Sequence, residues 1–208
     1  MRLGIADHLG WAVAVLADAE HAVVERRRLT LVEPGVSPAP IHYESARLDV
    51  AATAALVSRV RASVLRASAA ALDALPAPIA SISLRLWPPD FPDDIAVQRR
   101  PPYEARADAI MYRELLAELA HERGWEVHCY DAKHVEAQAA ALLGDRADRI
   151  LHGPRATLGP PWTKDHRVAL AATVITGRPA SHAASTPRST ARRLRSRRRA
   201  AGPRPPAG

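Results

Sequence analysis

The sequence predicts an α/β fold with a mixed β-sheet: a three-stranded antiparallel meander comes first, and helices and strands alternate after it. Two observations lead to this prediction. Extended runs of apolar and β-branched residues fill much of the first 43 positions, and from residue 49 apolar residues at helical spacing alternate with short strand-like runs. The chain has 208 residues, 48% hydrophobic and 25% charged, which is enough apolar material for a core of its own.

The first three predicted strands precede any helix. Residues 3–16 and 22–32 are expected to pair as a hairpin across a short polar connection, and residues 41–43 form a short edge strand after three prolines. An all-parallel dinucleotide-binding sheet would need a helix between the first two strands. The sequence also contains no Gly-x-Gly-x-x-Gly or P-loop pattern, so nucleotide binding by those motifs has no support.

Helices and strands then alternate to the end of the domain. A helix is expected from Asp49 to the prolines at 76 and 78, a strand over 79–87, a helix over 104–123 and a strand over 125–130. A helix over 135–151, which Gly144 and Asp145 can divide, and a last helix over 164–175 capped by Thr163 complete the fold. The long loop at 88–102, rich in Pro and Asp, is a candidate position for a functional site.

The positive charge is concentrated at the C-terminal end. The formal net charge is +7, but nine arginines and no acidic residue follow Gly177, so residues 1–177 carry a net charge of −2. We expect residues 1–177 to form the domain and residues 178–208, rich in Arg, Pro and Ala, to be a disordered basic tail. The arginines at 192–199 can bind polyanions in a salt-dependent way, or the tail can be a poorly constrained extension.

The sequence also predicts the cellular compartment of the protein. The longest apolar run is half the roughly 20 residues that cross a bilayer, and the N-terminus does not build a complete signal-like segment. The single Cys129 cannot form an internal disulfide. We therefore expect a cytoplasmic protein.

Two acidic residues are the best candidates for chemistry. Asp7 lies in an otherwise apolar strand, where a charge is costly unless it is paired or binds a metal. Asp165 shares a helical face with Val168 and Ala172, which should direct it toward the sheet. Alternatively, Asp7 is a turn residue that ends a shorter strand, and Asp165 is favoured only by the dipole at a helix start.

Two segments carry a family resemblance. Leu3-Gly-Ile-Ala-Asp7 with Gly10-Trp-Ala-Val13 is similar to the opening strands of the ribonuclease H-like superfamily, and Asp165-His-Arg-Val-Ala-Leu-Ala-Ala172 is similar to its last helix. Together with the element order, these segments most closely resemble the RuvC-like branch of Holliday-junction resolvases over residues 2–175. The resemblance implies a ribonuclease H-like fold and phosphodiester cleavage with Mg²⁺ or Mn²⁺.

The resemblance also implies a set of site residues. The implied metal ligands are Asp7, Asp165 and Asp90, and the implied catalytic residues are Asp7, Asp165 and Glu104. The fourth strand departs from the family, because Ser83, Arg85 and Trp87 stand where that strand should deliver a carboxylate. An acid from the following segment (Asp90, Asp93, Asp94 or Glu104) would have to replace it.

Basic residues near the candidate acids suggest a nucleic-acid surface. Arg99, Arg100 and Arg106, interleaved with tyrosines, and Lys164 are the expected contacts with DNA or RNA. The alternative is a set of ion pairs on a solvated surface. His8 and His166 each adjoin a candidate acid and can act as a proton shuttle or metal ligand.

The sequence therefore supports two functions. The leading hypothesis is a metal-dependent, nuclease-like or resolvase-like domain that processes nucleic acid. The second is a noncatalytic ribonuclease H-like module that keeps the fold, has lost its metal site and serves in binding or interaction. The missing carboxylate of the fourth strand favours the second.

Overall fold

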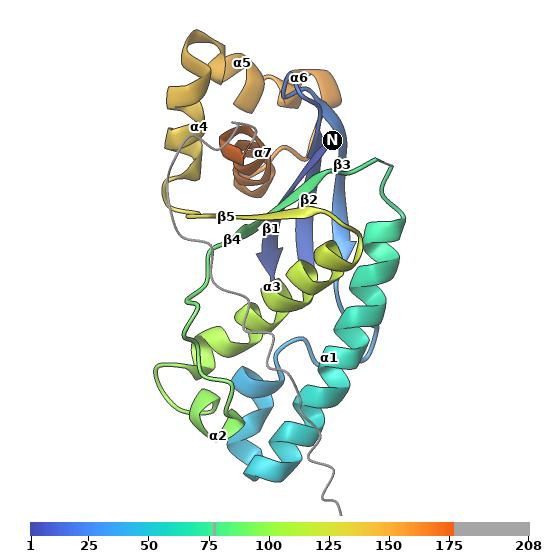
Figure 1. Cartoon of the computed structure of the whole chain (residues 1–208), viewed down its shortest axis with the longest axis vertical. Helices are drawn as coiled ribbons and strands as arrows, with labels where there is room; N and C mark the ends of the chain where they lie inside the picture. The colour runs from blue at the N-terminus through green and yellow to red at the C-terminus, as the bar shows by residue number, and fades with distance from the viewer. Residues whose placement is uncertain (77, 177–208) are drawn as a thin grey trace, which may run out of the picture.

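A computed structural model describes residues 1–76 and 78–176. Its centre is a five-stranded sheet in the order β3-β2-β1-β4-β5, formed by β1 (Arg2–His8), β2 (Trp11–Ala17), β3 (Val23–Thr30), β4 (Ser81–Arg85) and β5 (Glu126–Tyr130) (Figure 1). The first three strands pair antiparallel, whereas β4 is parallel to β1 and β5 is parallel to β4. The predicted α/β fold with a mixed sheet, in which an antiparallel meander precedes alternating helices and strands, is confirmed. The tail predicted at 178–208 lies outside the described residues.

The first hairpin is tighter than predicted. Residues 3–16 are not one strand: β1 and β2 are joined at Leu9 and Gly10, and His8 pairs with Trp11. Gly10 has a φ of +82°, and such a backbone conformation favours glycine. Both strands are almost entirely buried, so apolar residues dominate on both sides of the turn.

The prediction of a short edge strand at residues 41–43 is wrong. Pro40–Glu44 forms a turn of π-helix instead of an extended edge, and Ser45–Arg47 continues as a 3₁₀ turn. The reason is tertiary: the buried carboxylate of Asp108 accepts hydrogen bonds from the backbone N–H groups of Ile41 (3.1 Å) and His42 (2.9 Å). The third strand of the meander is β3.

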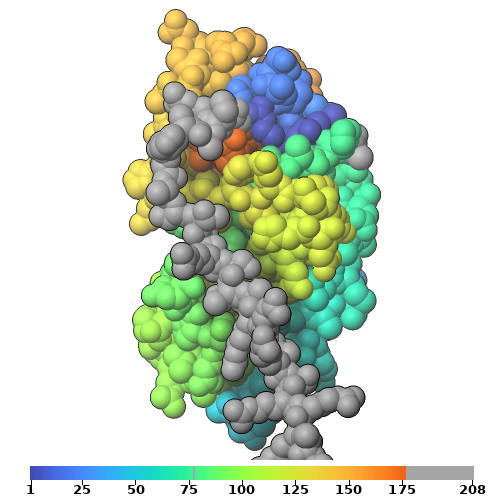
Figure 2. All heavy atoms as spheres, in the orientation of Figure 1, coloured from blue at the N-terminus to red at the C-terminus, as the bar shows by residue number. Residues whose placement is uncertain are grey.

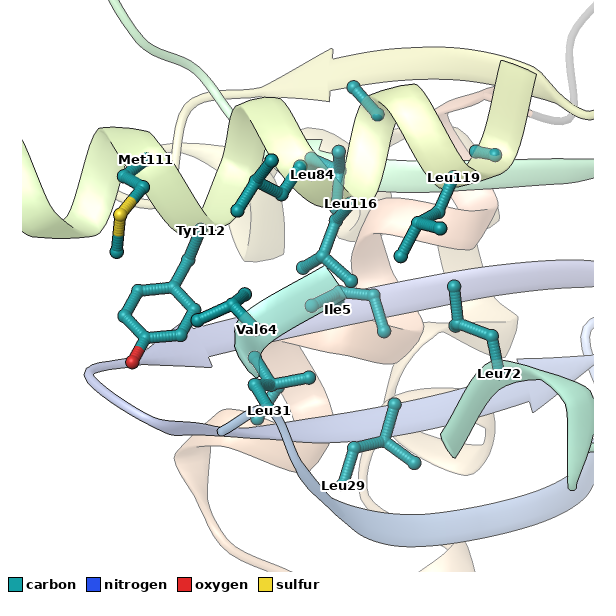
Figure 3. Packing of buried hydrophobic residues seen from close by; sticks show 14 of the residues in the cluster. Ile5, Leu29, Leu31, Val64, Leu72, Leu84, Met111, Tyr112, Leu116 and Leu119 are labelled. Atoms are coloured by element: carbon teal, nitrogen blue, oxygen red, sulfur yellow. The ribbon is translucent and has the colours of Figure 1, made fainter. Parts of the chain in front are cut away.

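Two long helices cover one face of the sheet. These are α1 (Val50–Asp73), capped by Asp49, whose carboxylate accepts from the Ala52 N–H at 2.7 Å, and α3 (Glu104–Glu122). Leu3 and Ile5 of β1 pack with them in a core that includes Leu72, Leu84 and Leu116 (Figure 3). In the space-filling view, α1 in teal and α3 in yellow-green form adjoining surfaces (Figure 2).

The other face is covered by the C-terminal helices α4 (Val135–Leu143), α5 (Ala147–Leu151) and α7 (Lys164–Thr176) (Figure 1). The predicted division at Gly144 is confirmed, with a 3₁₀ turn over Gly144–Arg146. The short helix α2 (Ile95–Gln98) lies within the segment predicted as a long loop, and the short helix α6 (Pro154–Leu158) lies between α5 and α7. No described helix is long and apolar enough to cross a membrane.

Close packing of α7 on β1 fixes one end of the candidate site. A Cβ atom added at Gly4 would lie 1.8 Å from the backbone oxygen of Ala169, so only glycine permits this approach. The small residues Ala169 and Ala172 face the sheet and are fully buried. This contact holds the first turn of α7, which carries Asp165, near the end of β1.

Candidate functional site

Asp7 is a buried, ion-paired strand residue. It pairs with Ala12 inside the β1–β2 ladder and is not a turn residue, and its side chain is only 1% exposed. The Nε–H of Arg113 on α3 donates to Asp7 Oδ2 at 2.9 Å, and Arg85 Nε lies 3.6 Å from Asp7 Oδ1. The charge that the sequence marked as costly is therefore compensated by guanidinium groups.

Asp165 lies in the first turn of α7 and belongs to the same network. Its Oδ2 lies 3.0 Å from His8 Nε2, and its Oδ1 lies 3.9 Å from Arg85 Nη2. The structure thus brings Asp7 and Asp165 together around the guanidinium of Arg85. This group stands at the end of β4, where the family resemblance calls for an acid.

Strand alternation explains why the two acids approach the arginine from different sides. Asp7 follows Leu3 and Ile5 on the face covered by α1 and α3, and accordingly meets Arg113 of α3. His8, the next residue, contacts Asp165 of α7 on the opposite face. Arg85 extends past the ends of the strands and reaches both carboxylates.

The side chains around Asp7 and Asp165 do not form a ligand set for the divalent ions that the resemblance implies. In residues 1–76 and 78–176, no three His, Cys, Asp or Glu side chains gather where they could hold a metal ion. Asp90 is exposed in the loop after β4, and Glu104 lies in the first turn of α3, so neither joins Asp7 and Asp165 as a ligand set. Two carboxylates facing two guanidiniums form a group without net charge, which offers a cation little attraction.

The expected nucleic-acid contacts differ in their surroundings. Arg99 Nη2 donates to the backbone oxygens of Ser45 (2.6 Å) and Leu48, so this arginine holds the loop before α1. Arg100, Arg106 and Lys164 are exposed, and they lie on three separate segments. The contact of these residues with nucleic acid stays a prediction.

Two further site residues, Arg85 and Arg113, are not among the sequence candidates for the acid cluster. The signal for them is indirect: a buried Asp7 needs a cationic partner, and Arg85 stands in the position of the expected strand-four acid. Only the packing of α3 on the sheet shows that Arg113, 106 positions away, is the closer partner.

The comparisons with known proteins give a resemblance in structure alone. No family model matches the chain, and no curated protein matches it. Solved structures of RuvC are similar to it. The chain resembles RuvC. RuvC of T. thermophilus in complex with a Holliday junction substrate is 14% identical, with 83% of this chain and 89% of that chain covered and a TM-score of 0.42. A second Thermus thermophilus RuvC structure is 15% identical, covers 83% of this chain and 90% of that chain, and has a TM-score of 0.39.

The likeness to these RuvC structures is one of overall structure at low sequence identity. It does not transfer a residue role to this chain.

Proposed function

We propose that this chain is a noncatalytic ribonuclease H-like binding module whose metal site has been replaced by an internal ion-pair network. The observation that supports the proposal is the position of Arg85, whose guanidinium lies 3.6 Å from Asp7 and 3.9 Å from Asp165. Arg113 holds the second oxygen of Asp7 at 2.9 Å. The carboxylates that a nuclease would present to metal ions are directed at arginines.

Electrostatics argues against joint occupation by arginine and metal. Arginine stays protonated in proteins, so it cannot lose its charge when a cation approaches. A divalent ion about 4 Å from a guanidinium would be repelled by roughly 8 kcal/mol at an effective dielectric constant of about 20. Two-metal phosphodiester cleavage also needs three or four acids, and two are present here.

DNA or RNA is the partner we propose for the module. The exposed arginines Arg100 and Arg106 and the exposed Lys164 are available for phosphate contacts without a metal ion. Such contacts position a nucleic acid and carry little sequence information.

The test is isothermal titration of Mn²⁺ into the wild-type chain, Asp7→Asn and Arg85→Glu. We expect no Asp7-dependent Mn²⁺ binding by the wild type. Arg85→Glu removes the guanidinium and supplies a carboxylate on β4, so we expect it to gain Mn²⁺ binding. Glu118→Gln, an exposed change on α3, is the control and should match the wild type.

The competing function is the metal-dependent, nuclease-like enzyme. Stoichiometric Mn²⁺ binding by the wild type that Asp7→Asn abolishes, together with cleavage of a branched DNA or an RNA substrate, would support that enzyme. It would overturn the noncatalytic proposal.

A further inference from the structure

A second site candidate lies beside the ion-pair network. A cleft of about 440 Å³, here called the Trp11 cleft, opens between β2 and β3 on one side and the start of α7 on the other. Its size falls within the roughly 300–1,000 Å³ typical of small-ligand sites. The lining residues used below are Trp11, Arg26, Arg28, Thr163, Asp165 and His166.

Trp11 provides a flat surface that already holds planar groups. The His8 ring stacks on it with centroids 4.0 Å apart and an interplanar angle of 10°, and the Arg28 guanidinium carbon lies 3.7 Å from the ring centroid. The cause is cross-strand register: Val13 pairs with Arg28, which places Arg28 diagonally to Trp11 on the same sheet face. Nucleobases bind to such surfaces by stacking.

Two arginines of the cleft, Arg26 and Arg28, have no carboxylate partner among the described residues. Arg26 donates four hydrogen bonds of 2.6–3.3 Å to the backbone oxygens of residues 158–161, which fixes the wall of the cleft before α7. Neither Arg26 nor Arg28 forms a salt bridge with a described acid. Asp165, the acid of the cleft, is already shared by His8 and Arg85. An anionic ligand is therefore favoured over a cation.

His166 adds a hydrogen-bond donor of fixed orientation. Its Nδ1 accepts from the Thr163 N–H at 3.2 Å and lies 2.8 Å from Thr163 Oγ1, so in the neutral ring the proton is on Nε2. The residue is 7% exposed, and no described protein group accepts a hydrogen bond from Nε2.

We infer that the Trp11 cleft binds a nucleotide unit, with the base stacked on Trp11 and the phosphate held by Arg28. A base that enters the cleft takes the place of the Arg28 guanidinium on the Trp11 ring, and the freed guanidinium then pairs with the phosphate. His166 Nε2–H and the Asp165 carboxylate offer a donor and an acceptor to the base edge or the ribose. This site requires no metal and does not depend on the loss of the carboxylate cluster.

The nucleotide can be free or part of a single strand, and titrations on the full-length chain in EDTA separate these sources. The probes are AMP, UMP, ribose 5-phosphate and a fluorescent dT12 oligonucleotide, the last at several salt concentrations. We expect AMP or UMP to bind more tightly than ribose 5-phosphate, because only the nucleotides can stack. Binding of dT12 that depends on Trp11, and persists where salt weakens nonspecific contacts, identifies a strand as the ligand.

Three variants make the inference falsifiable. Trp11→Ala and Arg28→Gln should each weaken nucleotide binding at least tenfold, while Trp11→Phe keeps an aromatic face and should retain part of the affinity. Arg47→Gln, an exposed arginine outside the cleft, is the charge-matched control and should bind like the wild type. Equal affinities of wild type, Trp11→Phe and Arg28→Gln for every probe, or no binding at all, would overturn the inference.

The Mn²⁺ titrations remain independent of this result. Nucleotide binding in EDTA can succeed or fail whether or not Asp7 binds a metal. Failure of one proposal is thus distinguishable from failure of the other.

Discussion

Arg113 donates its Nε–H to the carboxylate of Asp7 across 2.9 Å, and this contact joins α3 to the end of β1. The Asp7 side chain is 1% exposed and that of Arg113 is 15% exposed, so water cannot easily replace either partner. The pair therefore has a structural role in addition to its bearing on metal binding.

The first prediction concerns this pair. Arg113→Ala leaves a buried carboxylate with only the longer contact to Arg85, and we expect the free energy of unfolding to fall by about 3–5 kcal/mol. Urea denaturation followed by circular dichroism measures the loss. The double variant Asp7→Asn with Arg113→Gln should lose less than the sum of its single variants. Strictly additive losses would show that the two side chains do not interact in solution.

The second prediction concerns the contact between β1 and α7. Gly4→Ala places a methyl group 1.8 Å from the Ala169 oxygen, so α7 must move. We expect a loss above the roughly 1–3 kcal/mol of ordinary overpacking, measured by thermal or urea denaturation. Gly35→Ala is the control: it has open space but a φ of +79°, and should cost only about 1–2 kcal/mol. Equal losses for both variants would contradict the close approach of α7.

The third prediction concerns pH. Burial raises the pKa of Asp108, with Glu44 acting in the same direction, while the N–H groups of Ile41 and His42 and the His42 side chain oppose the shift. The folded state then holds the proton at pH values where the unfolded chain has lost it. The contribution of Asp108 to stability therefore falls as pH rises above the usual Asp pKa of 3.8.

The direction of this pH dependence of stability is checked by comparison with the Asp108→Asn variant. The wild type should be more stable than the variant at low pH, and its advantage should shrink as pH rises through the raised pKa of Asp108. Urea denaturation from pH 3.5 to 7 measures the difference, with Glu118→Gln on the exposed side of α3 as the control. An advantage that grows with pH would mean that the Asp108 pKa is lowered instead.

The fourth prediction concerns the C-terminal arginines. Residues 178–208 carry nine arginines and no acid, whereas residues 1–177 carry a net charge of −2. Removal of residues 178–208 should abolish most nonspecific DNA binding, measured by fluorescence anisotropy at several salt concentrations. The melting temperature should hardly change, because both faces of the sheet are covered by residues before 177. Any salt-dependent binding that remains should be lost in Arg100→Ala with Arg106→Ala, which are the contacts that we propose on the domain. DNA affinity that the truncation leaves unchanged would contradict the prediction.

The sequence by itself determined the fold class and most of the elements. The spacing of apolar residues and the positions of proline and glycine are local signals. They predicted α1, α3, α7, β4 and β5 close to their observed bounds. The same signals marked Asp7 as unusual, because a carboxylate among apolar residues needs a partner wherever it is buried. They selected Asp165 by its place on the helical face shared with Val168 and Ala172.

Only the tertiary structure decided what those partners are. The helical turn at Pro40–Glu44 forms because Asp108, 67 positions after Ile41, accepts its backbone N–H, and no local pattern contains that contact. Likewise, Arg113 and Arg85 reach Asp7 because α3 packs on the sheet and β4 lies beside β1. A carboxylate binds a metal ion or a guanidinium by the same attraction, and the choice depends on which group the fold brings within about 4 Å.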